Sequence, residues 1–273
     1  MISRSNLFII ALLILGMYFY QSKISEKPKI DHIAVVNIKG SAIPINYIQW
    51  EYYLWKAIKN KNAKAIIIKV NCYGGYGYNH IKDLIEYAAT KKPTVGYIQK
   101  AATSAGYGII SSAKINLFAQ QTSVVGSIGS WNQINNFDEL HKYLGYKQEI
   151  IYDNKSFNQL YNPSNPKHEE QILNSIKKYC EKIFFKRILD NRNIDKKHFN
   201  GKWWLGDEAK QYNFVDHIIT HIDEIKEFLI TNHNINKELD YKEYNIKAKV
   251  YRAFFRPSDI ISLIQQLINI LIT

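Results

Sequence analysis

Two short segments carry residue types that together could hydrolyse an acyl bond. The first, residues 71–75, reads Asn-Cys-Tyr-Gly-Gly, and the second, residues 101–108, reads Ala-Ala-Thr-Ser-Ala-Gly-Tyr-Gly. The paired glycines Gly74 and Gly75 can adopt backbone conformations open to few other residues and can present N–H groups to an oxyanion. Ser104 lies among small residues, which leaves the clearance that a nucleophilic hydroxyl needs. Each segment also has a structural interpretation, since Gly-Gly can be a simple turn and Ser104 a helix N-cap.

The residues around these segments predict the elements that must position them. Apolar runs predict strands over 32–40, 65–70, 94–98 and 115–119, and helical periodicity predicts helices over 47–58, 80–89, 105–112, 135–144 and 167–191. Residues 201–218 are expected to close the domain with a turn, a short helix and a strand. Strands that alternate with helices indicate an α/β fold of repeated, parallel βαβ units. Both segments follow strands, and functional sites in such sheets lie at the carboxyl ends of the strands.

Four segments, taken in order, resemble the signal peptide peptidase A family of membrane-anchored serine peptidases. They are residues 71–75, 102–108, 124–130 (Val-Val-Gly-Ser-Ile-Gly-Ser) and 200–216, and the resemblance covers residues 32–230. It implies a Clp-protease/crotonase-like fold, a serine peptidase domain over residues 32–232 and no cofactor.

The resemblance also assigns roles to residues. Ser104 corresponds to the nucleophile, Gly74 and Gly75 to the oxyanion loop, and Ser127 to a serine that helps to position the base. The closing signature of the family matches Gly201, Trp204, Gly206, Ala209, Val215 and Asp216. Two positions depart from the family pattern, because Tyr73 stands where proline is usual and Ala105 where glycine is usual. Tyr73 is expected to narrow the cleft.

The general base is where the resemblance is weakest. The family uses a lysine about fifty residues after the nucleophile, and alignment by Pro163 puts Asn158 at that position. Asparagine cannot act as a base, whereas Lys155 lies 51 residues after Ser104 and is the expected base of a Ser-Lys dyad. Other candidates are weaker, since His80 and His141 fall on expected helices and no His or Asp spacing supports Cys72 as a nucleophile.

The N-terminus predicts a membrane anchor. Residues 5–22 are uncharged, and as a helix they would span about 27 Å, near the lower limit for crossing a bilayer core of about 30 Å. Aromatic residues end the segment and no small-residue cleavage site follows, which favours an uncleaved signal anchor over 1–22, with a polar linker over 23–31, rather than a buried core helix. We expect a single-pass membrane protein with its catalytic domain on the extracytoplasmic side. The charges leave the orientation open, because Arg4 precedes the segment and Lys23, Lys27 and Lys29 follow it.

The C-terminal tail, residues 233–273, is expected to contain an amphipathic helix over 259–273. Its broad apolar stripe must be covered by the membrane surface, by a neighbouring subunit or by its own domain. The tail and the ring-like oligomers of the resembled family together predict a homo-oligomer.

Composition narrows the class of partner. Lys and Arg number 36 against 24 Asp and Glu, a formal net charge of +12, but the lysines are scattered and no arginine-rich block occurs, which argues against a nucleic-acid binder. With only Cys72 and Cys180, the chain cannot be a disulfide scaffold or a structural zinc protein, and nothing in it requires a metal.

These observations favour a membrane-anchored serine endopeptidase that hydrolyses hydrophobic peptides such as residual signal peptides. One alternative is a degenerate, non-catalytic pseudopeptidase that acts as a membrane-bound binding or scaffold protein. A crotonase-type acyl-CoA enzyme would also use Gly-Gly amides, but the anchor and the nucleophile-like Ser104 argue against it.

Overall fold

The computed structural model describes residues 30–76, 80–111, 113–130, 137–147 and 166–245. The expected anchor over 1–22, Lys155, Asn158 and the expected helix over 259–273 lie outside these residues. Within the described part of the chain, no helix is both long enough and apolar enough to cross a membrane.

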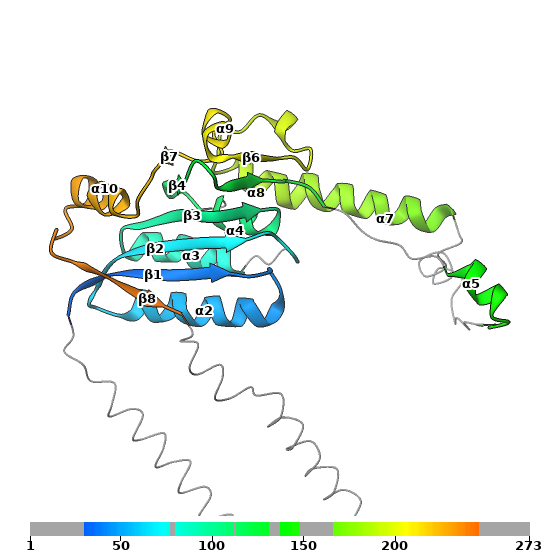
Figure 1. Ribbon diagram of the computed structural model, residues 1–273, viewed down its shortest axis with the longest axis horizontal. Coiled ribbons are helices and arrows are strands. Elements are labelled where there is room, and N and C mark those ends of the chain that lie inside the picture. Colours follow the sequence, from blue (N-terminus) through cyan, green and yellow to red (C-terminus); the bar gives the residue numbers. More distant parts are fainter. Residues whose placement is uncertain (1–29, 77–79, 112, 131–136, 148–165, 246–273) are drawn as a thin grey trace, which may run out of the picture.

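An eight-stranded sheet lies at the centre of the described residues (Figure 1). The strand order is β6-β5-β3-β2-β1-β8, and β4 pairs with both β3 and β7. The strands are β1 (His32–Lys39), β2 (Ala63–Cys72), β3 (Thr94–Thr103), β4 (Leu117–Ala119), β5 (Val124–Gly126), β6 (Trp203–Leu205), β7 (His217–Ile218) and β8 (Asp240–Tyr244).

Helices connect and cover these strands. They are α2 (Pro44–Lys59), α3 (His80–Lys91), α4 (Ala105–Ser111), α5 (Asp138–Tyr143), α7 (Pro166–Tyr179), the π-helical turn η1 (Cys180–Phe185), α8 (Lys186–Leu189), the 3₁₀ turn η2 (Lys196–His198), α9 (Gly206–Gln211) and α10 (Asp223–His233). In Figure 1, α7 projects away from the sheet toward α5.

The expected parallel βαβ units are confirmed. β1, β2 and β3 pair in parallel, with α2 between the first two strands and α3 between the last two. The central strand β2 has no exposed surface at Ile66, Ile67 and Ile68. Three consecutive buried residues indicate a strand covered on both faces, as parallel strands in α/β proteins are.

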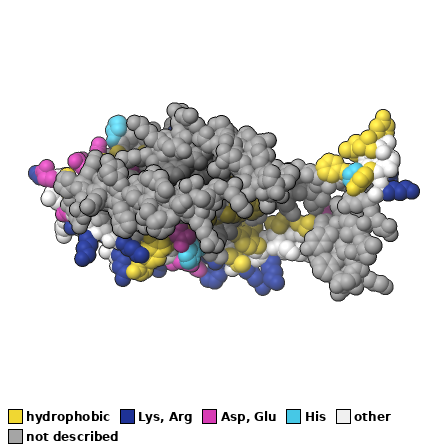
Figure 2. All heavy atoms as spheres, turned by 90° about the horizontal axis from the view of Figure 1, so that it is seen from below, with side chains coloured by type: hydrophobic (Ala, Val, Ile, Leu, Met, Phe, Trp, Pro, Cys, Tyr) yellow, Lys and Arg dark blue, Asp and Glu magenta, His cyan; other side chains and the backbone are white. Residues whose placement is uncertain are grey.

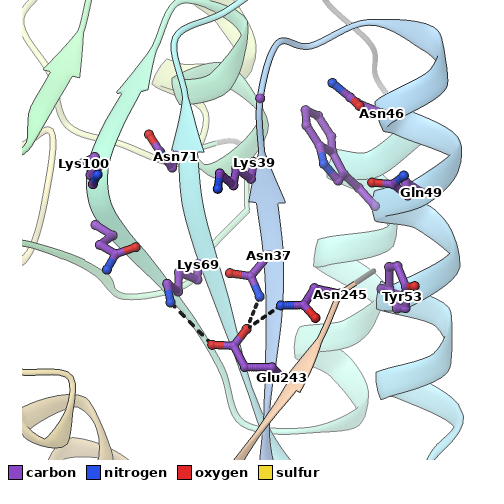
Figure 3. A pocket seen from close by; sticks show the side chains of 13 residues that line it. Asn37, Lys39, Asn46, Gln49, Tyr53, Lys69, Asn71, Lys100, Glu243 and Asn245 are labelled. Atoms are coloured by element: carbon purple, nitrogen blue, oxygen red, sulfur yellow. Dashed lines mark hydrogen bonds and ion pairs between the residues drawn. The ribbon is translucent and has the colours of Figure 1, made fainter. Parts of the chain in front are cut away.

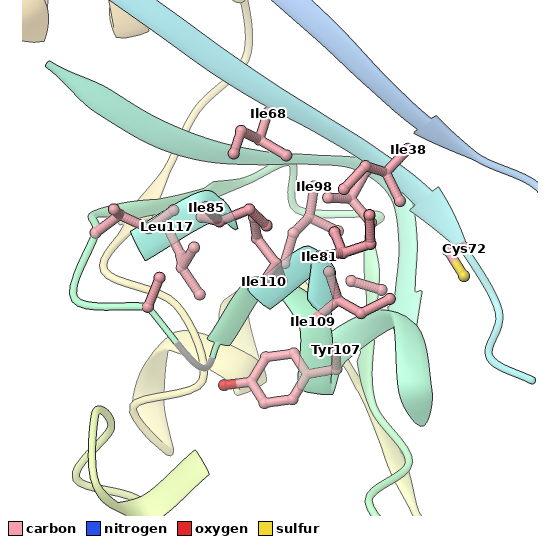
Figure 4. Packing of buried hydrophobic residues seen from close by; sticks show 14 of the residues in the cluster. Ile38, Ile68, Cys72, Ile81, Ile85, Ile98, Tyr107, Ile109, Ile110 and Leu117 are labelled. Carbon is pink, nitrogen blue, oxygen red and sulfur yellow. The ribbon is translucent and has the colours of Figure 1, made fainter. Parts of the chain in front are cut away.

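The larger hydrophobic core lies on the sheet face covered by α2, α3 and α4. α3 contributes Ile81 and Ile85, which have no exposed surface, and α4 contributes Tyr107 and Ile110. Figure 4 shows these side chains packed against Ile98 and its neighbours on the strands. Each fully buried side chain of this size contributes about 1.5–3 kcal/mol relative to exposure, so this cluster is a major part of the free energy of folding.

β3 is longer than the sequence pattern indicates, and it divides its pairing between two strands. Residues Gly96–Ile98 pair with β4, and Ala101–Thr103 pair with β5. Residues 101–103, expected in a loop, are therefore strand residues, and Ser104 follows the strand directly. The strand expected from the sequence ends at residue 98, before the true end of β3, because the polar residues Gln99 and Lys100 interrupt the apolar run.

The C-terminal part of the described chain also differs from expectation. The helix expected over 167–191 is interrupted by the π-helical turn η1 before α8. α10 and β8 were not predicted, and β8 pairs in parallel with β1 through residues 240–244. These residues, assigned by sequence to the tail, form one edge of the sheet.

A buried polar network joins α4 to the closing segment. The Arg192 guanidinium forms an ion pair with Asp216 at 2.9 Å, and its side chain is only 7% exposed. Asp216 Oδ2 also accepts a hydrogen bond of 2.7 Å from the Leu117 amide, and the Tyr107 hydroxyl donates to the Phe214 carbonyl at 2.9 Å. Burial raises the pKa of Tyr107, so its hydroxyl keeps its proton and remains a donor.

We predict that Asp216→Ala lowers the free energy of unfolding by about 3 kcal/mol, because it leaves a buried guanidinium without its carboxylate. The matched control is Asp190→Ala, whose partner Lys186 is 66% exposed, and it should cost less than about 1 kcal/mol. Urea unfolding followed by tryptophan fluorescence measures both. Equal losses in the two variants would show that the Arg192 pair is not a buried stabilising contact.

Candidate active site

The Gly74–Gly75 loop follows β2 directly and has a backbone that only glycine adopts without strain. Gly74 has φ +117° and Gly75 has φ +137°. A Cβ atom on Gly74 would lie 2.8 Å from Ser104 Cβ, and one on Gly75 would lie 2.5 Å from the Ala42 carbonyl oxygen. Any side chain at either position would therefore collide with a neighbouring segment.

A short parallel bridge to Ala42 fixes this loop. The Ala42 amide donates to the Gly74 carbonyl at 2.8 Å, and the Tyr76 amide donates to the Ala42 carbonyl at 2.8 Å. A bridge of this pattern leaves the N–H of Gly75 pointing away from Ala42, and no hydrogen bond recorded among the described residues uses that amide. A free backbone N–H on a fixed loop is the kind of donor that stabilises an oxyanion.

Ser104 occupies the turn between β3 and α4 in a left-handed conformation, with φ +52°. Its amide donates to the Gly126 carbonyl at 2.8 Å, and its carbonyl accepts from the Gly108 amide at 2.9 Å. Among the described residues no hydrogen bond is recorded for its hydroxyl, and a Cβ on Gly74 would lie 3.3 Å from Ser104 Oγ. The structure therefore brings the hydroxyl of Ser104 and the Gly74–Gly75 loop together.

Ser127 lies beside this turn on the adjacent strand end. Thr103 pairs with Gly126, so Ser104 and Ser127 are the next residues on two neighbouring strands. Ser127 also has a left-handed backbone, with φ +49°, and its hydroxyl donates to the Gly201 carbonyl at 3.0 Å. The serine thus ties the strand end to the closing signature segment.

Small residues on α4 allow the close approach of the two loops. A Cβ on Gly106 would lie 2.4 Å from the Cys72 carbonyl oxygen, and one on Gly108 would lie 2.5 Å from Phe184 Cε2 of η1. At Gly106, α4 packs closely against the end of β2, and at Gly108 the π-helical turn η1 packs closely against α4. Both contacts hold the first turn of α4, and with it Ser104, in place.

Residues of the closing signature, 200–216, contact the segments next to the candidate site. Trp204 of β6 pairs with Val125 of β5, and a Cβ on Gly206 would lie 2.1 Å from the Gln120 carbonyl oxygen. Asp216 holds Arg192, a partner that sequence reasoning missed. Arg192 stands between Asn191 and Asn193, so nothing in the sequence indicated that it would be buried beside Asp216.

The alternative groups lie in other environments. Cys72 is fully buried, and burial raises the pKa of its thiol, which makes it a poor nucleophile. His80 contacts Glu51 at 3.2 Å at the start of α3, and the ring of His141 packs against Tyr146. Lys155 and Asn158 fall in residues 148–165, outside the described part. No group of three or more His, Cys, Asp or Glu side chains that could hold a metal ion occurs within the described ranges.

Comparison with known proteins gives a family match and several more distant similarities. The sequence model of peptidase family S49 matches residues 86–234, more than half of the 273 residues. The chain is 28% identical over 176 residues to "Putative protease MJ0651" of Methanocaldococcus jannaschii, across 62% of this chain and 56% of that protein. It is 29% identical over 177 residues to the Na(+)/H(+) antiporter NhaA of Brucella melitensis, across 60% of this chain and 23% of that protein.

Among solved structures, the chain resembles the 1510-N membrane protease of Pyrococcus horikoshii, which is specific for a stomatin homolog. That similarity has a TM-score of 0.44 and 18% identity, and it covers 82% of this chain and 98% of the other. In sequence, this chain spans about half the length of the archaeal relative and about a quarter of the antiporter.

We predict that Ser104→Gly stabilises the protein by about 1 kcal/mol, because it removes the cost of a left-handed non-glycine residue without removing a hydrogen bond recorded in the described part. Ser104→Ala keeps the strained backbone and should leave the stability nearly unchanged. Ser127→Gly should gain less than Ser104→Gly, since it also loses the bond to Gly201. Thermal unfolding of the three variants measures this order, and a Ser104→Gly variant no more stable than Ser104→Ala would contradict it.

Proposed function

Because the chain belongs to peptidase family S49, we propose that it is a membrane-anchored serine endopeptidase whose nucleophile is Ser104. The family match agrees with the resemblance that the four sequence motifs indicated. Residues 86–234 include Ser104, Ser127 and the whole closing signature.

The observation that carries this proposal is the position of Ser104 Oγ against the Gly74–Gly75 loop. In the proposed reaction, the oxygen attacks the carbonyl carbon of a peptide bond, and the carbonyl oxygen becomes an oxyanion that accepts a hydrogen bond from the Gly75 amide. The resulting acyl-enzyme is then hydrolysed by water, which returns Ser104 to its hydroxyl form. A donor held on a fixed loop needs no rearrangement during the step, and removing one such donor typically costs about 10²–10³-fold in rate.

We propose Lys155 as the general base. It takes the proton from Ser104 as the C–O bond forms and passes it to the leaving amine when the peptide C–N bond breaks. A lysine with an ordinary pKa of about 10.4 is protonated at neutral pH, so this role needs burial or a neighbouring cation to lower the pKa.

The proposed substrates are extended hydrophobic segments such as residual signal peptides. Tyr73 and Tyr76 flank the glycine loop and are 68% and 76% exposed, so their rings offer apolar surface next to the proposed oxyanion site. An anchor over residues 1–22 would hold this surface beside the bilayer, with the catalytic domain on the extracytoplasmic side. Self-association, with the C-terminal tail at an interface or on the membrane, completes the proposed organisation.

A second candidate function is a non-catalytic protein that binds peptides at the same site, beside Ser104 and the Gly74–Gly75 loop. The observation that favours it is Asn158, which takes the place of the expected lysine when the segment is aligned by Pro163. The two candidates share the fold and the proposed substrate class, and they differ only in the presence of a base.

We predict that the full-length chain in detergent cleaves an internally quenched hydrophobic peptide and that Ser104→Ala lowers the rate by about 10³-fold or more, because the attacking oxygen is removed. Ser41→Ala, an exposed serine outside the site, is the matched control and should retain full activity. Cleavage that survives Ser104→Ala would exclude Ser104 as the nucleophile.

A further prediction concerns the base. Lys155→Ala should abolish cleavage while Asn158→Ala leaves it intact, and kcat/KM should rise with pH through a single ionisation, since only the neutral amine accepts the proton. A wild-type chain that is inert, but gains hydrolysis through Asn158→Lys, would support the binding protein instead. Cleavage that persists in Lys155→Ala would contradict the Ser-Lys dyad.

A further inference from the structure

The sheet face opposite α2, α3 and α4 has two halves of different character. Its amino-terminal half carries Ile33 and Val35 of β1 and Ile67 of β2, which pack with Leu229 of α10 in a second hydrophobic cluster. Side chains alternate along a strand, so residues 37 and 39 of β1 and 69 and 71 of β2 continue the same face. These four residues are Asn37, Lys39, Lys69 and Asn71. The face is therefore polar toward the carboxyl ends of β1 and β2, where α10 does not cover it.

A groove of about 930 Å³ lies over this polar half. Its lining residues on the strands are Asn37 and Lys39 of β1, Lys69 and Asn71 of β2, Lys100 of β3 and Glu243 of β8. β8 pairs with β1 only as far as Val36, and beyond that residue α2, which lies next to the edge of β1, forms one wall of the groove. Figure 3 shows these side chains on one side of the strands, with Gln49 and Tyr53 of α2 beside them. We call this feature the lysine groove.

The lysine groove has a net positive charge. Its carboxylate, Glu243, accepts a hydrogen bond from Asn37 and pairs with Lys69 at 3.4 Å (Figure 3). Lys39 and Lys100 are exposed, and no ion pair with a carboxylate of the described residues is recorded for either. Two ammonium groups in the groove are therefore available to an anionic ligand.

Its remaining polar groups are amides. Asn71 lines the groove, and its Oδ1 is buried and has no hydrogen-bond partner among the described residues. Asn37, Asn71 and Gln99 side chains match the N–H and C=O groups of an extended polypeptide, which need one donor and one acceptor each. No arginine of the described residues lines the groove, so the groove lacks the planar set of donors that binds a phosphate through two parallel hydrogen bonds.

We propose that the lysine groove binds an acidic stretch of polypeptide, with Lys39 and Lys100 pairing to its carboxylates and the amide side chains hydrogen-bonding to its backbone. Lys100 precedes Ser104 by four residues and Asn71 precedes Gly74 by three, distances of about 13 Å and 10 Å along a strand. A polypeptide bound there lies near the Gly74–Gly75 loop. The proposal concerns binding and does not require that the chain cleave peptides.

The experiment measures binding of a fluorescein-labelled twelve-residue Glu-Ser repeat peptide to the full chain in detergent, by anisotropy, in a Ser104→Ala background that prevents cleavage. We expect the double variant Lys39→Glu with Lys100→Glu to raise Kd at least tenfold. The matched control is Lys178→Glu with Lys182→Glu, two exposed lysines of α7 and η1, which makes the same change in net charge. Figure 2 shows Lys and Arg side chains at several places on the face that it draws, so the experiment needs a control for positive charge in general.

The control variant should change Kd less than twofold, and a Gln-Ser repeat peptide should bind at least tenfold more weakly than the Glu-Ser peptide. Equal losses in the two double variants, or equal binding of the two peptides, would overturn the proposal. Inorganic polyphosphate that binds more tightly than the peptide and depends on Lys39 and Lys100 would also overturn it, in favour of a phosphate site. Activity plays no part in the readout, so failure here leaves the proposed peptidase function untouched.

Discussion

The candidate site depends on the contact between the loop after β2 and the turn after β3. The space between Gly74 and Ser104 is too small for a Cβ atom, and the space between Gly106 of α4 and the Cys72 carbonyl is also too small for one. Two neighbouring parallel strands bring these segments to one edge of the sheet, but only glycine lets them touch. Ser104 has a strained, left-handed backbone in this arrangement, and its backbone hydrogen bonds with Gly126 and Gly108 hold it in that conformation.

Much of this arrangement could be predicted from sequence because it follows from local patterns. The apolar runs and helical periods gave the order of strands and helices up to β4, and parallel pairing then put residues 71–75 and Ser104 at the same end of the sheet. The family match agrees with the motifs that carried the resemblance. The motifs around Gly74, Gly75 and Gly106 are informative because these positions have no room for a Cβ atom, a condition that only glycine meets.

Other features could not be predicted, because they arise from contacts distant in sequence. Asp216 belongs to the closing signature, but nothing in the sequence indicated that Arg192 is its partner. β8 becomes a strand only by pairing with β1. The lysine groove needs three strands side by side before Lys39, Lys69 and Lys100 share a surface. In sequence these lysines were part of a diffuse positive charge, and only the fold separates them from the others.

The central claim is that Ser104 is a nucleophile activated by its surroundings, not simply a helix-capping serine. Mass-spectrometric peptide mapping after treatment with a serine-reactive phosphonate tests it most directly, because the reagent forms a covalent bond only with an activated hydroxyl. The account predicts a single adduct, on Ser104. A wild-type chain that stays unmodified, or carries its adduct on another residue, would contradict the account.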